Sequence, residues 1–407
     1  MSPGSPTDVL VVGGGVIGLS IAWKAAASGH AVTVVDTRPG HGASWAAAGM
    51  LAPAGEAHFG EDRLTELNIE AVRAWPAFAR VLEHESGMAV DLVAEGTLLV
   101  AVDPSDLAAT DDLLDYRRTL GLSAHRRSAR ECRAAEPLLA PGIRGGAELV
   151  DDHQVDNRRV VEALILACRS RGVAFVEDEV AEVTTGADGV TGVVLGNAEA
   201  LAGTAVVVAA GCRSGQLGGL PEDVLPPVRP VKGLTLRLRA GDGVTGLRRT
   251  VRGLVHGRSC YLVPRPDRSV VVGATVEEKG FDTTVQVGPV GDLLDDARRL
   301  VPSLEEYELV DITTGLRPGS PDNAPIVGRT RIAGLLMATG HYRNGILLAP
   351  LTAQAVVAML DGPDGERGGQ GPFARFGPGR FEPTVGAGTG PVDGPPPGPA
   401  AFSGAGR

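Results

Sequence analysis

The sequence predicts an α/β fold in which a discontinuous Rossmann-like domain carries an inserted α+β domain built on an antiparallel sheet. Three observations lead to this prediction. Residues 9–36 follow the pattern strand, glycine-rich turn, helix and second strand, which is typical of a β-α-β unit. Residues 228–274 contain segments in which apolar and polar residues alternate, as in antiparallel strands. Residues 335–360 return to a buried strand followed by a helix, so the first domain resumes late in the chain.

The opening unit has glycines at all three positions of a G-x-G-x-x-G motif, Gly13, Gly15 and Gly18. We expect Gly13 to make the tight turn, Gly15 to let the backbone approach a pyrophosphate, and Gly18 to let the helix pack closely on the strand. The pyrophosphate would bind the free N–H groups at the positive end of the helix dipole. Asp36 ends the second strand, where a carboxylate suits a ribose 2′-hydroxyl and repels a 2′-phosphate. The unit therefore predicts a dinucleotide site rather than a purely structural turn, with NAD and FAD both open.

The composition argues against several classes of protein. The chain has 407 residues, enough for two domains, and no apolar run is long enough to span a bilayer. The first residues show no basic stretch followed by an apolar one, so the cytoplasm is the expected location. The formal net charge of −11 argues against nucleic-acid binding, which depends on lysine and arginine. The cysteines form no C-x-x-C pair, so we expect no disulfide framework, no metal site and four small buried side chains. They are Cys132, Cys168, Cys212 and Cys260.

The other helices and strands are predicted from the spacing of apolar residues and from the glycines and prolines that stop them. Helices are predicted at 64–85, 106–120, 129–136, 160–171, 292–300 and 351–360. Strands are predicted at 98–102, 174–176, 190–195, 205–209, 228–239, 260–274 (with a turn at 264–267) and 335–338. The entirely apolar run at 205–209 is typical of a parallel strand that is covered on both faces.

These patterns divide the chain into two domains and a tail. The dinucleotide-binding domain is assigned to 1–85, 150–221 and 323–360, and the inserted domain, which would bind the substrate, to 86–149 and 222–322. From residue 361 onward glycine and proline dominate and apolar periodicity is absent. Such a segment cannot bury enough surface to offset its ordering entropy, so we expect a disordered tail over 361–407.

Two arginines stand in settings that direct a side chain toward a ligand. Arg317 lies between a Gly-Leu pair and a proline that constrain its backbone, and Arg343 lies in a glycine-flanked loop after a buried strand. A guanidinium suits a carboxylate because its planar donors pair with both oxygens at once. The alternative for either arginine is a surface ion pair. Tyr261 is either a pocket residue or a half-buried strand tyrosine with a bonded hydroxyl.

Short motifs spread over nearly all of the chain before the tail resemble the D-amino-acid oxidase family of FAD-dependent amine oxidases. Within that family the chain is most similar to the branch that oxidises glycine in thiamine biosynthesis. The motifs are 13–18, 44–51, 230–233, 260–265, 272–275, 315–318 and 340–350, of which the last two are the most specific. No cysteine lies in the 340–350 loop, near which covalently flavinylated members have one, so the resemblance implies non-covalent FAD.

The resemblance implies that glycine, oxygen and water give glyoxylate, ammonia and hydrogen peroxide, and that the iminoacetate formed first feeds the thiazole of thiamine. Hydride would pass from the substrate Cα to FAD, so no catalytic acid or base is required of the protein. His341 would then lie near the flavin rather than accept a proton. Arg317 would bind the substrate carboxylate, Arg343 would lie beside substrate and flavin, and Tyr261 would line the pocket.

The resemblance also implies a set of cofactor contacts. Val16 and Ile17 lie at the pyrophosphate turn with Gly13, Gly15 and Gly18, Asp36 and Thr37 at the adenosine ribose, and Val180 at the adenine. Ala43, Ser44, Ala48, Gly49 and Met50 lie along the isoalloxazine, and His341, Tyr342, Arg343, Asn344, Gly345, Ile346 and Leu347 close on the flavin.

Two residues depart from the pattern of the resembled branch, and both are expected to line the pocket. Val276 replaces a methionine and Ser259 replaces a histidine. A sarcosine or D-amino-acid oxidase or dehydrogenase is therefore the alternative activity, and a flavin- or NAD-binding protein without oxidase activity is the alternative from another class. The expected partners are a small amine and oxygen, with no nucleic acid and no membrane, and the resemblance implies a homo-oligomer, a tetramer.

Overall fold

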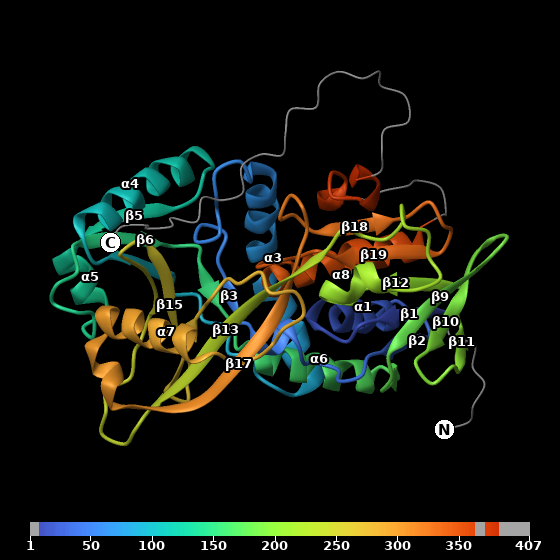
Figure 1. Cartoon of the computed structure of the whole chain (residues 1–407), viewed down its shortest axis with the longest axis horizontal. Helices are drawn as coiled ribbons and strands as arrows, with labels where there is room; N and C mark the ends of the chain where they lie inside the picture. The colour runs from blue at the N-terminus through green and yellow to red at the C-terminus, as the bar shows by residue number, and fades with distance from the viewer. Residues whose placement is uncertain (1–7, 363–370, 382–407) are drawn as a thin grey trace.

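The computed structural model describes residues 8–362 and 371–381, which form two halves built on two large sheets (Figure 1). In Figure 1 the six-stranded sheet lies at the right and the eight-stranded sheet at the left. The long strands β13 (Arg229–Ala240) and β17 (Tyr307–Gly319) run diagonally across the view. The predicted fold class, a Rossmann-like α/β half joined to an α+β half with a mostly antiparallel sheet, is confirmed.

The six-stranded sheet is the Rossmann-like part of the molecule. Its strands, in spatial order, are β18 (Ile326–Arg329), β19 (Leu335–Thr339), β12 (Ala205–Val208), β1 (Val9–Val12), β2 (Val32–Val35) and β8 (Ala174–Val176). Neighbours are parallel except β18, which pairs antiparallel with β19. Because β1 lies inside the sheet, its glycine turn opens at the carboxyl edge, where α/β folds bind ligands.

Both faces of this sheet are covered, which explains why its strands are largely apolar. Val9 and Val11 face a helical layer, whereas Leu10 and Val12 face a small three-stranded sheet. The helices are α1 (Val16–Ala27), α3 (Asp62–Ser86), α6 (Asn157–Ser170) and α8 (Gly345–Asp361). The small sheet consists of β9 (Val180–Gly186), β10 (Gly189–Leu195) and β11 (Ala200–Ala202).

The eight-stranded sheet forms the second half. After β17 and β13 its order is β16 (Ser269–Gly273), β15 (Arg258–Pro264), β14 (Thr250–Val255), β4 (Thr97–Ala101), β6 (Gly145–Leu149) and β5 (Ala124–Ser128). All neighbours are antiparallel except β14 and β4. The helices α7 (Val287–Leu300) and α5 (Ala129–Ala135) pack on one face, and α4 (Pro104–Thr119) packs on the other. The domain boundaries derived from the sequence stay a prediction.

Short elements complete the described chain. They are α2 (Ala43–Ala46), β3 (Met50–Leu51), β7 (His153–Gln154), η1 (Gly211–Gln216) and η2 (Pro302–Glu306). β3 and β7 pair with each other, which ties the segment after α2 to the start of α6. The position of this segment matters below, because it forms one wall of the site.

Several strands of the second half were not predicted. β5, β6, β14 and β17 have no counterpart among the predicted elements. β5 and β17 are the two edge strands of their sheet, and much of each is exposed or only partly buried. An edge strand needs little apolar alternation because its backbone partner, rather than its own burial, holds it in place.

The last long helix begins earlier than predicted. α8 starts at Gly345 rather than at Leu351, and it continues through Pro350. Proline lacks an N–H group and so removes one helical hydrogen bond, which is why it was interpreted as a stop. The helix persists because nearly all its residues from 346 to 359 are buried, and α1 and α3 pack against it.

Part of the predicted disordered tail is ordered. Residues 371–381 form η3 (Gly371–Phe373) and η4 (Pro378–Phe381), with Phe373 and Phe376 buried in the main core. The Val327 N–H donates to the Phe376 carbonyl at 2.9 Å, which attaches this segment to β18. Disorder is therefore a wrong prediction for 371–381, because two phenylalanines supply the burial that the average composition lacks. Asp361 at the start of the predicted tail is the last residue of α8, and 363–370 and 382–407 lie outside the described residues.

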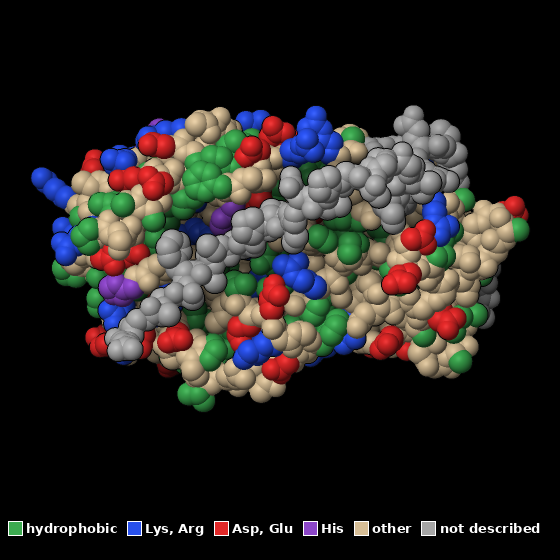
Figure 2. All heavy atoms as spheres, turned by 45° about the horizontal axis from the view of Figure 1, so that its top comes forward, with side chains coloured by type: hydrophobic (Ala, Val, Ile, Leu, Met, Phe, Trp, Pro, Cys, Tyr) green, Lys and Arg blue, Asp and Glu red, His purple; other side chains and the backbone are tan. Residues whose placement is uncertain are grey.

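Within 8–362 and 371–381, no helix is long and apolar enough to cross a membrane. On the face shown in Figure 2, acidic and basic side chains are interspersed over the described surface.

Candidate active site

A cavity of about 680 Å³ lies between the two halves of the molecule. At one end it is lined by the carboxyl ends of β1 and β2, the amino end of α1 and the start of β9. The middle is lined by the segment 43–50 and by the loop before α8. Its other end is lined by residues of β13, β15 and β17. The cavity therefore reaches from the Rossmann-like edge to the face of the second sheet.

The dinucleotide end is shaped by main-chain atoms. A side chain at Gly13, where φ is +106°, would overlap the Ala209 carbonyl at the end of β12, and one at Gly18 would overlap the Gly13 carbonyl. The helix α1 has no side-chain cap from its own N-cap residue, and the Val16 N–H is bonded instead by the Ser44 hydroxyl at 2.9 Å. The exposed end of the helix dipole thus faces the cavity, as an anionic group requires.

Asp36 stands at the wall of this end with its carboxylate held by the backbone. Its two oxygens accept the N–H of Gly14 at 2.6 Å and the N–H of Arg38 at 2.7 Å. Each carboxylate oxygen keeps a second lone pair, so the group can still accept a ribose hydroxyl. Val180, the first residue of β9, also lines this end.

The segment 43–50 forms one wall of the cavity, and side chains from other elements hold four of its carbonyls. The Asn157 amide donates to the carbonyls of Ser44 and Trp45 at 2.8 and 3.0 Å. The Thr235 hydroxyl donates to Ala46 at 3.0 Å, and the buried Arg265 donates to Ala48 at 2.6 Å. Small side chains and backbone are left to face the cavity, which suits a planar ring system.

At the far end, Arg317 and Tyr261 lie together in the second sheet. The Arg317 guanidinium occupies the space above Gly233 and donates to the Thr275 carbonyl at 3.1 Å. The Tyr261 ring lies over Gly273, where a side chain would overlap it. Burial raises the pKa of Tyr261, and the nearby Arg317 charge opposes that rise. Among the described residues Arg317 has no ion-pair partner, so its charge is available to a carboxylate.

Arg343 is paired, in contrast. Its Nε lies 2.7 Å from Glu56 Oε2, its Nη2 lies 3.6 Å from Glu61 Oε2, and its guanidinium lies 4.7 Å from the ring centre of Tyr342. The other oxygen of Glu56 accepts Arg252 Nη1 at 2.8 Å. Burial would raise the pKa of Glu56, but the two guanidiniums outweigh it and lower the pKa to about 2. Glu56 is therefore ionised at physiological pH and lines the cavity.

His341 is buried in the cavity wall and hydrogen-bonded. Its Nε2 lies 3.0 Å from the Thr352 hydroxyl, and burial lowers the pKa of the ring to about 3. The imidazole is neutral at physiological pH, and its charged form is strongly disfavoured. It is thus poorly suited to accept a proton.

Nearly all residues predicted for the site lie at this one cavity. Arg317, Arg343 and Tyr261 line it, as do all the predicted cofactor positions except Gly18 and Leu347. Gly18 packs under the first turn, which is the role expected of it. Leu347 belongs to α8, and its carbonyl accepts the Trp75 indole N–H at 2.9 Å, so it lies toward α3 instead of the cavity.

The structure corrects the expected places of three further residues. Ser259 is exposed and Val276 is 63% exposed, and neither is among the residues that line the cavity, so the expected pocket lining is wrong for both. Two residues along β15 carry Ser259 about 7 Å from Tyr261, toward the hairpin end. Cys212 is only partly buried and lines the cavity, whereas the other three cysteines are buried; all four are free.

Sequence reasoning missed three side chains that shape the site: Glu56, Asn157 and Arg265. Asn157 and Arg265 act on backbone carbonyls of a segment far away in the sequence. Glu56 stands alone among small apolar residues, in Ala52-Pro53-Ala54-Gly55-Glu56-Ala57, and that isolation was the available signal.

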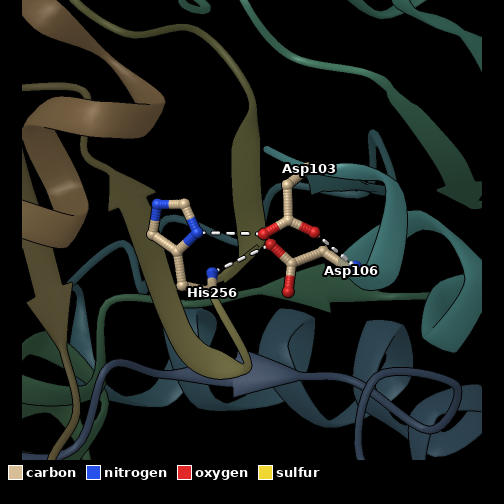
Figure 3. Close-up of side chains that lie close together, drawn as sticks. All are labelled: Asp103, Asp106 and His256. Atoms are coloured by element: carbon tan, nitrogen blue, oxygen red, sulfur yellow. Dashed lines mark hydrogen bonds and ion pairs between the residues drawn. The ribbon is translucent and has the colours of Figure 1, made fainter. Parts of the chain in front are cut away.

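Three side chains that could in principle bind a metal ion lie close together outside the cavity: Asp103, Asp106 and His256 (Figure 3). Asp103 caps α4 by accepting the Asp106 N–H at 2.9 Å. The Asp106 carboxylate accepts the backbone N–H groups of His256 and Gly257, at 2.9 and 2.8 Å. The His256 ring lies 2.9 Å from Asp103. These bonds hold the β14–β15 hairpin against the start of α4, so the cluster has a structural role.

Comparison with known proteins gives a consistent picture. The profile of the family described as FAD dependent oxidoreductase matches residues 8–359. Glycine oxidase of Geobacillus kaustophilus is 34% identical over 361 residues, which cover 87% of this chain and 93% of that protein. Its crystal structure superposes with a TM-score of 0.81 at 33% identity, covering 88% of this chain and 95% of that one. The bifunctional ThiO/ThiG protein of Trichormus variabilis is 32% identical over 354 residues, or 87% of this chain. This chain spans about half, 52%, of that relative.

Proposed function

The chain belongs to the family of FAD-dependent oxidoreductases, and we propose that it is an amine oxidase whose substrate is glycine. The products would be glyoxylate, ammonia and hydrogen peroxide, with the intermediate iminoacetate available for the thiazole of thiamine. The observation that carries this proposal is one continuous cavity, which joins a dinucleotide cradle at one end to Arg317 at the other, a guanidinium without an ion-pair partner among residues 8–362 and 371–381.

The residues present fit FAD along the length of the cavity. The backbone turn at Gly13 leaves no room for a side chain, and the dipole of α1 faces the space where a pyrophosphate would bind. Asp36 and Val180 would hold the adenosine part of FAD, and the wall formed by residues 43–50 would lie against the isoalloxazine ring. The backbone of Gly345 and Ile346 in the first turn of α8 offers N–H groups to the ring, whereas the Asn344 N–H already donates to the His341 carbonyl at 2.8 Å.

When bound, FAD accepts the hydride from the substrate Cα and delivers the electrons to oxygen. The protein then has to place that carbon against the ring and exclude competing reactions. Arg317 would anchor the carboxylate from the second sheet, and Tyr261 would close the adjacent wall. Because His341 is neutral and bonded to Thr352, we propose that the amine proton leaves to solvent when the substrate binds.

The proximity of the two predicted anchors supports a small substrate. The Arg317 guanidinium lies over Gly233 and the Tyr261 ring over Gly273, which are diagonal neighbours on the paired strands β13 and β16, so little room separates the two side chains. Glycine, sarcosine and D-alanine all carry one carboxylate and one amine and differ only by a methyl group. The glycine oxidase of Geobacillus kaustophilus, 34% identical over 87% of this chain, supports glycine among them.

The test is peroxide release from purified, flavin-loaded protein given glycine, sarcosine or D-alanine. We expect the highest kcat/KM with glycine. Strong turnover of sarcosine or D-alanine without turnover of glycine would replace this proposal by the alternative activity. A protein with a flavin absorption band but no peroxide from any of the three amines would argue for a dehydrogenase or a binding protein.

A further inference from the structure

Four arginines line the cavity, Arg38, Arg213, Arg317 and Arg343, and the protein treats the charges of the last two differently. Arg317 donates to backbone carbonyls and has no ion-pair partner among the described residues. Arg343 has carboxylates on two sides, Glu56 at 2.7 Å and Glu61 at 3.6 Å. Of these two arginines, Arg317 therefore offers a substrate an available positive charge, whereas the charge of Arg343 is already compensated.

Glu56 is held in place by a buried framework. The carboxylate of Asp152 accepts the N–H groups of Ala54 and Gly55, at 2.8 and 2.7 Å, which fixes the backbone just before Glu56. Arg252 approaches from β14 and fills the space above Gly55, where a side chain would overlap its guanidinium. Only 11% of the Glu56 side chain and 12% of the Arg252 side chain are exposed, so the Arg252–Glu56–Arg343 bridge cannot rearrange freely.

This arrangement sets the electrostatics of the cavity wall. A second anionic group on a substrate would meet an uncompensated positive charge on Arg343 only by displacing Glu56. That displacement would leave a buried carboxylate with one partner instead of two, and losing a partner in a buried ion pair is costly. A second anion that approached without displacing Glu56 would meet a like charge in a place of low dielectric constant.

We propose that Glu56 is a specificity-determining residue that restricts the site to substrates with a single carboxylate. This inference rests on the proposed function, because it assumes that Arg317 binds the substrate carboxylate. It is selection by repulsion, in which Glu56 adds nothing to binding of the preferred substrate and rejects the dicarboxylate. Amino acids with an acidic side chain form the excluded class, and glycine and its neutral relatives form the accepted one.

The test compares the binding of acetate and malonate, a monocarboxylate and a dicarboxylate, to the flavin-loaded protein. Each dissociation constant is measured from the change in flavin absorption, which requires no turnover. In Glu56→Gln we expect the preference for acetate over malonate to fall on the order of tenfold, which corresponds to 1.4 kcal/mol. Glu56→Asp keeps the charge and should keep the preference. In turnover, Glu56→Gln should raise kcat/KM for D-aspartate relative to D-alanine.

A matched control exists elsewhere in the chain. Glu148 also bridges two arginines, Arg127 at 2.5 Å and Arg249 at 2.8 Å, but it does not line the cavity. Glu148→Gln removes the same charge from the same kind of bridge and should leave the acetate-to-malonate ratio unchanged. An equal shift in this control would mean that net charge, and not Glu56, sets the preference.

Glu61→Gln provides a second variant in case Glu56→Gln does not retain flavin. It removes the more distant carboxylate from Arg343 and leaves the Arg252–Glu56 pair in place, so the ratio should shift in the same direction by less. An unchanged ratio in the flavin-retaining variants at both positions would overturn the inference. If glycine is oxidised and the ratio does not move, the specificity inference fails alone. If the ratio moves but no amine is oxidised, the proposed oxidase activity fails, and Glu56 selects among bound carboxylates rather than among substrates.

Discussion

The two ends of the cavity differ in composition, because one is formed mainly by backbone atoms and the other by charged side chains. At the dinucleotide end the backbone forms most of the binding surface. Gly13 and Gly18 bring main-chain atoms together, and the N–H groups at the start of α1 point toward the space where a ligand would bind. At the substrate end charged side chains determine the binding properties. Glu56 pairs with Arg252 and Arg343, which leaves Arg317 as the available charge. The first end tolerates almost no change of shape, whereas the second can be altered one charge at a time. Changes at the first should therefore abolish cofactor binding, and changes at the second should alter substrate choice with the cofactor retained.

The largest effect is expected from Gly18→Val. The new side chain would overlap the Gly13 carbonyl and push α1 away from β1. Overpacking of a core costs about 1–3 kcal/mol when side chains can give way, and backbone cannot give way so easily. We expect purified protein without a flavin absorption band. Gly288→Ala, on α7 with open space around it, is the control and should keep its flavin. Full flavin content in Gly18→Val would disprove the backbone-built description of this end.

Arg317→Met should separate the two ends most clearly. We expect affinity for glycine and for acetate to fall on the order of 10²- to 10³-fold, because a buried charge pair with the carboxylate is lost. Flavin content should be unchanged. Steady-state kinetics and acetate titration measure the loss, with Arg298→Met, an exposed arginine paired with Asp295, as the control. Unchanged kinetics would remove Arg317 from the site.

His341 should make stability depend on pH. Burial lowers its pKa from 6.5 to about 3, so between these values the unfolded chain binds a proton that the folded chain does not. Stability contributed by the neutral ring is complete above pH 6.5 and is lost as the pH falls toward 3, at about 1.4 kcal/mol per pH unit.

The measurement is urea unfolding of wild type and His341→Gln at several values between pH 6 and 4. The difference in unfolding free energy should shrink by that slope as the pH falls. Other titrating groups, such as Glu56, contribute to both proteins and cancel in the difference. A constant difference across this range would show that the ring is not buried in its neutral form.

The smallest effect is expected from Asn157→Ala. This change removes the donor to the Ser44 carbonyl and the shorter of two donors to the Trp45 carbonyl, which keeps Arg158 Nε at 3.4 Å; a buried acceptor left without a partner costs about 1–3 kcal/mol. We expect FAD to bind about tenfold more weakly, with glycine KM little changed in the flavin-saturated enzyme. Asn197→Ala, at an exposed turn, is the control. An effect on KM instead of flavin affinity would mean that the wall at 43–50 belongs to the substrate end.

The sequence was most informative where function depends on local order. The spacing of Gly13, Gly15 and Gly18, followed by Asp36, predicted the cradle because turn, helix start and acidic residue lie within one β-α-β unit. Arg317 and Tyr261 were identified because each stands in a distinctive short motif. Ser259 and Val276 were misplaced for the same reason, since closeness to a motif in sequence does not determine the direction of a side chain.

The edge strands and the tail show the limits of composition and periodicity. β17 carries Arg317, yet its own residues are half-exposed, and only its pairing with β13 makes it a strand. The segment 371–381 has the composition of a disordered region, but Phe373 and Phe376 find a place in a core formed by other elements. Both outcomes depend on partners that are remote in sequence.

The sequence by itself determined the class of fold, and it predicted the dinucleotide cradle and an arginine that anchors a carboxylate. Each of these depends on residues close together in the chain, whose geometry is set by glycine, by apolar spacing and by strand–turn–helix order. Only the tertiary structure decided which arginine is available. Arg317 and Arg343 look alike in sequence, and the difference between them is Glu56, which lies 287 positions from Arg343 and meets it at 2.7 Å. Charge compensation depends on the distance between charges in space, and only folding brings residues so far apart in the chain to that distance.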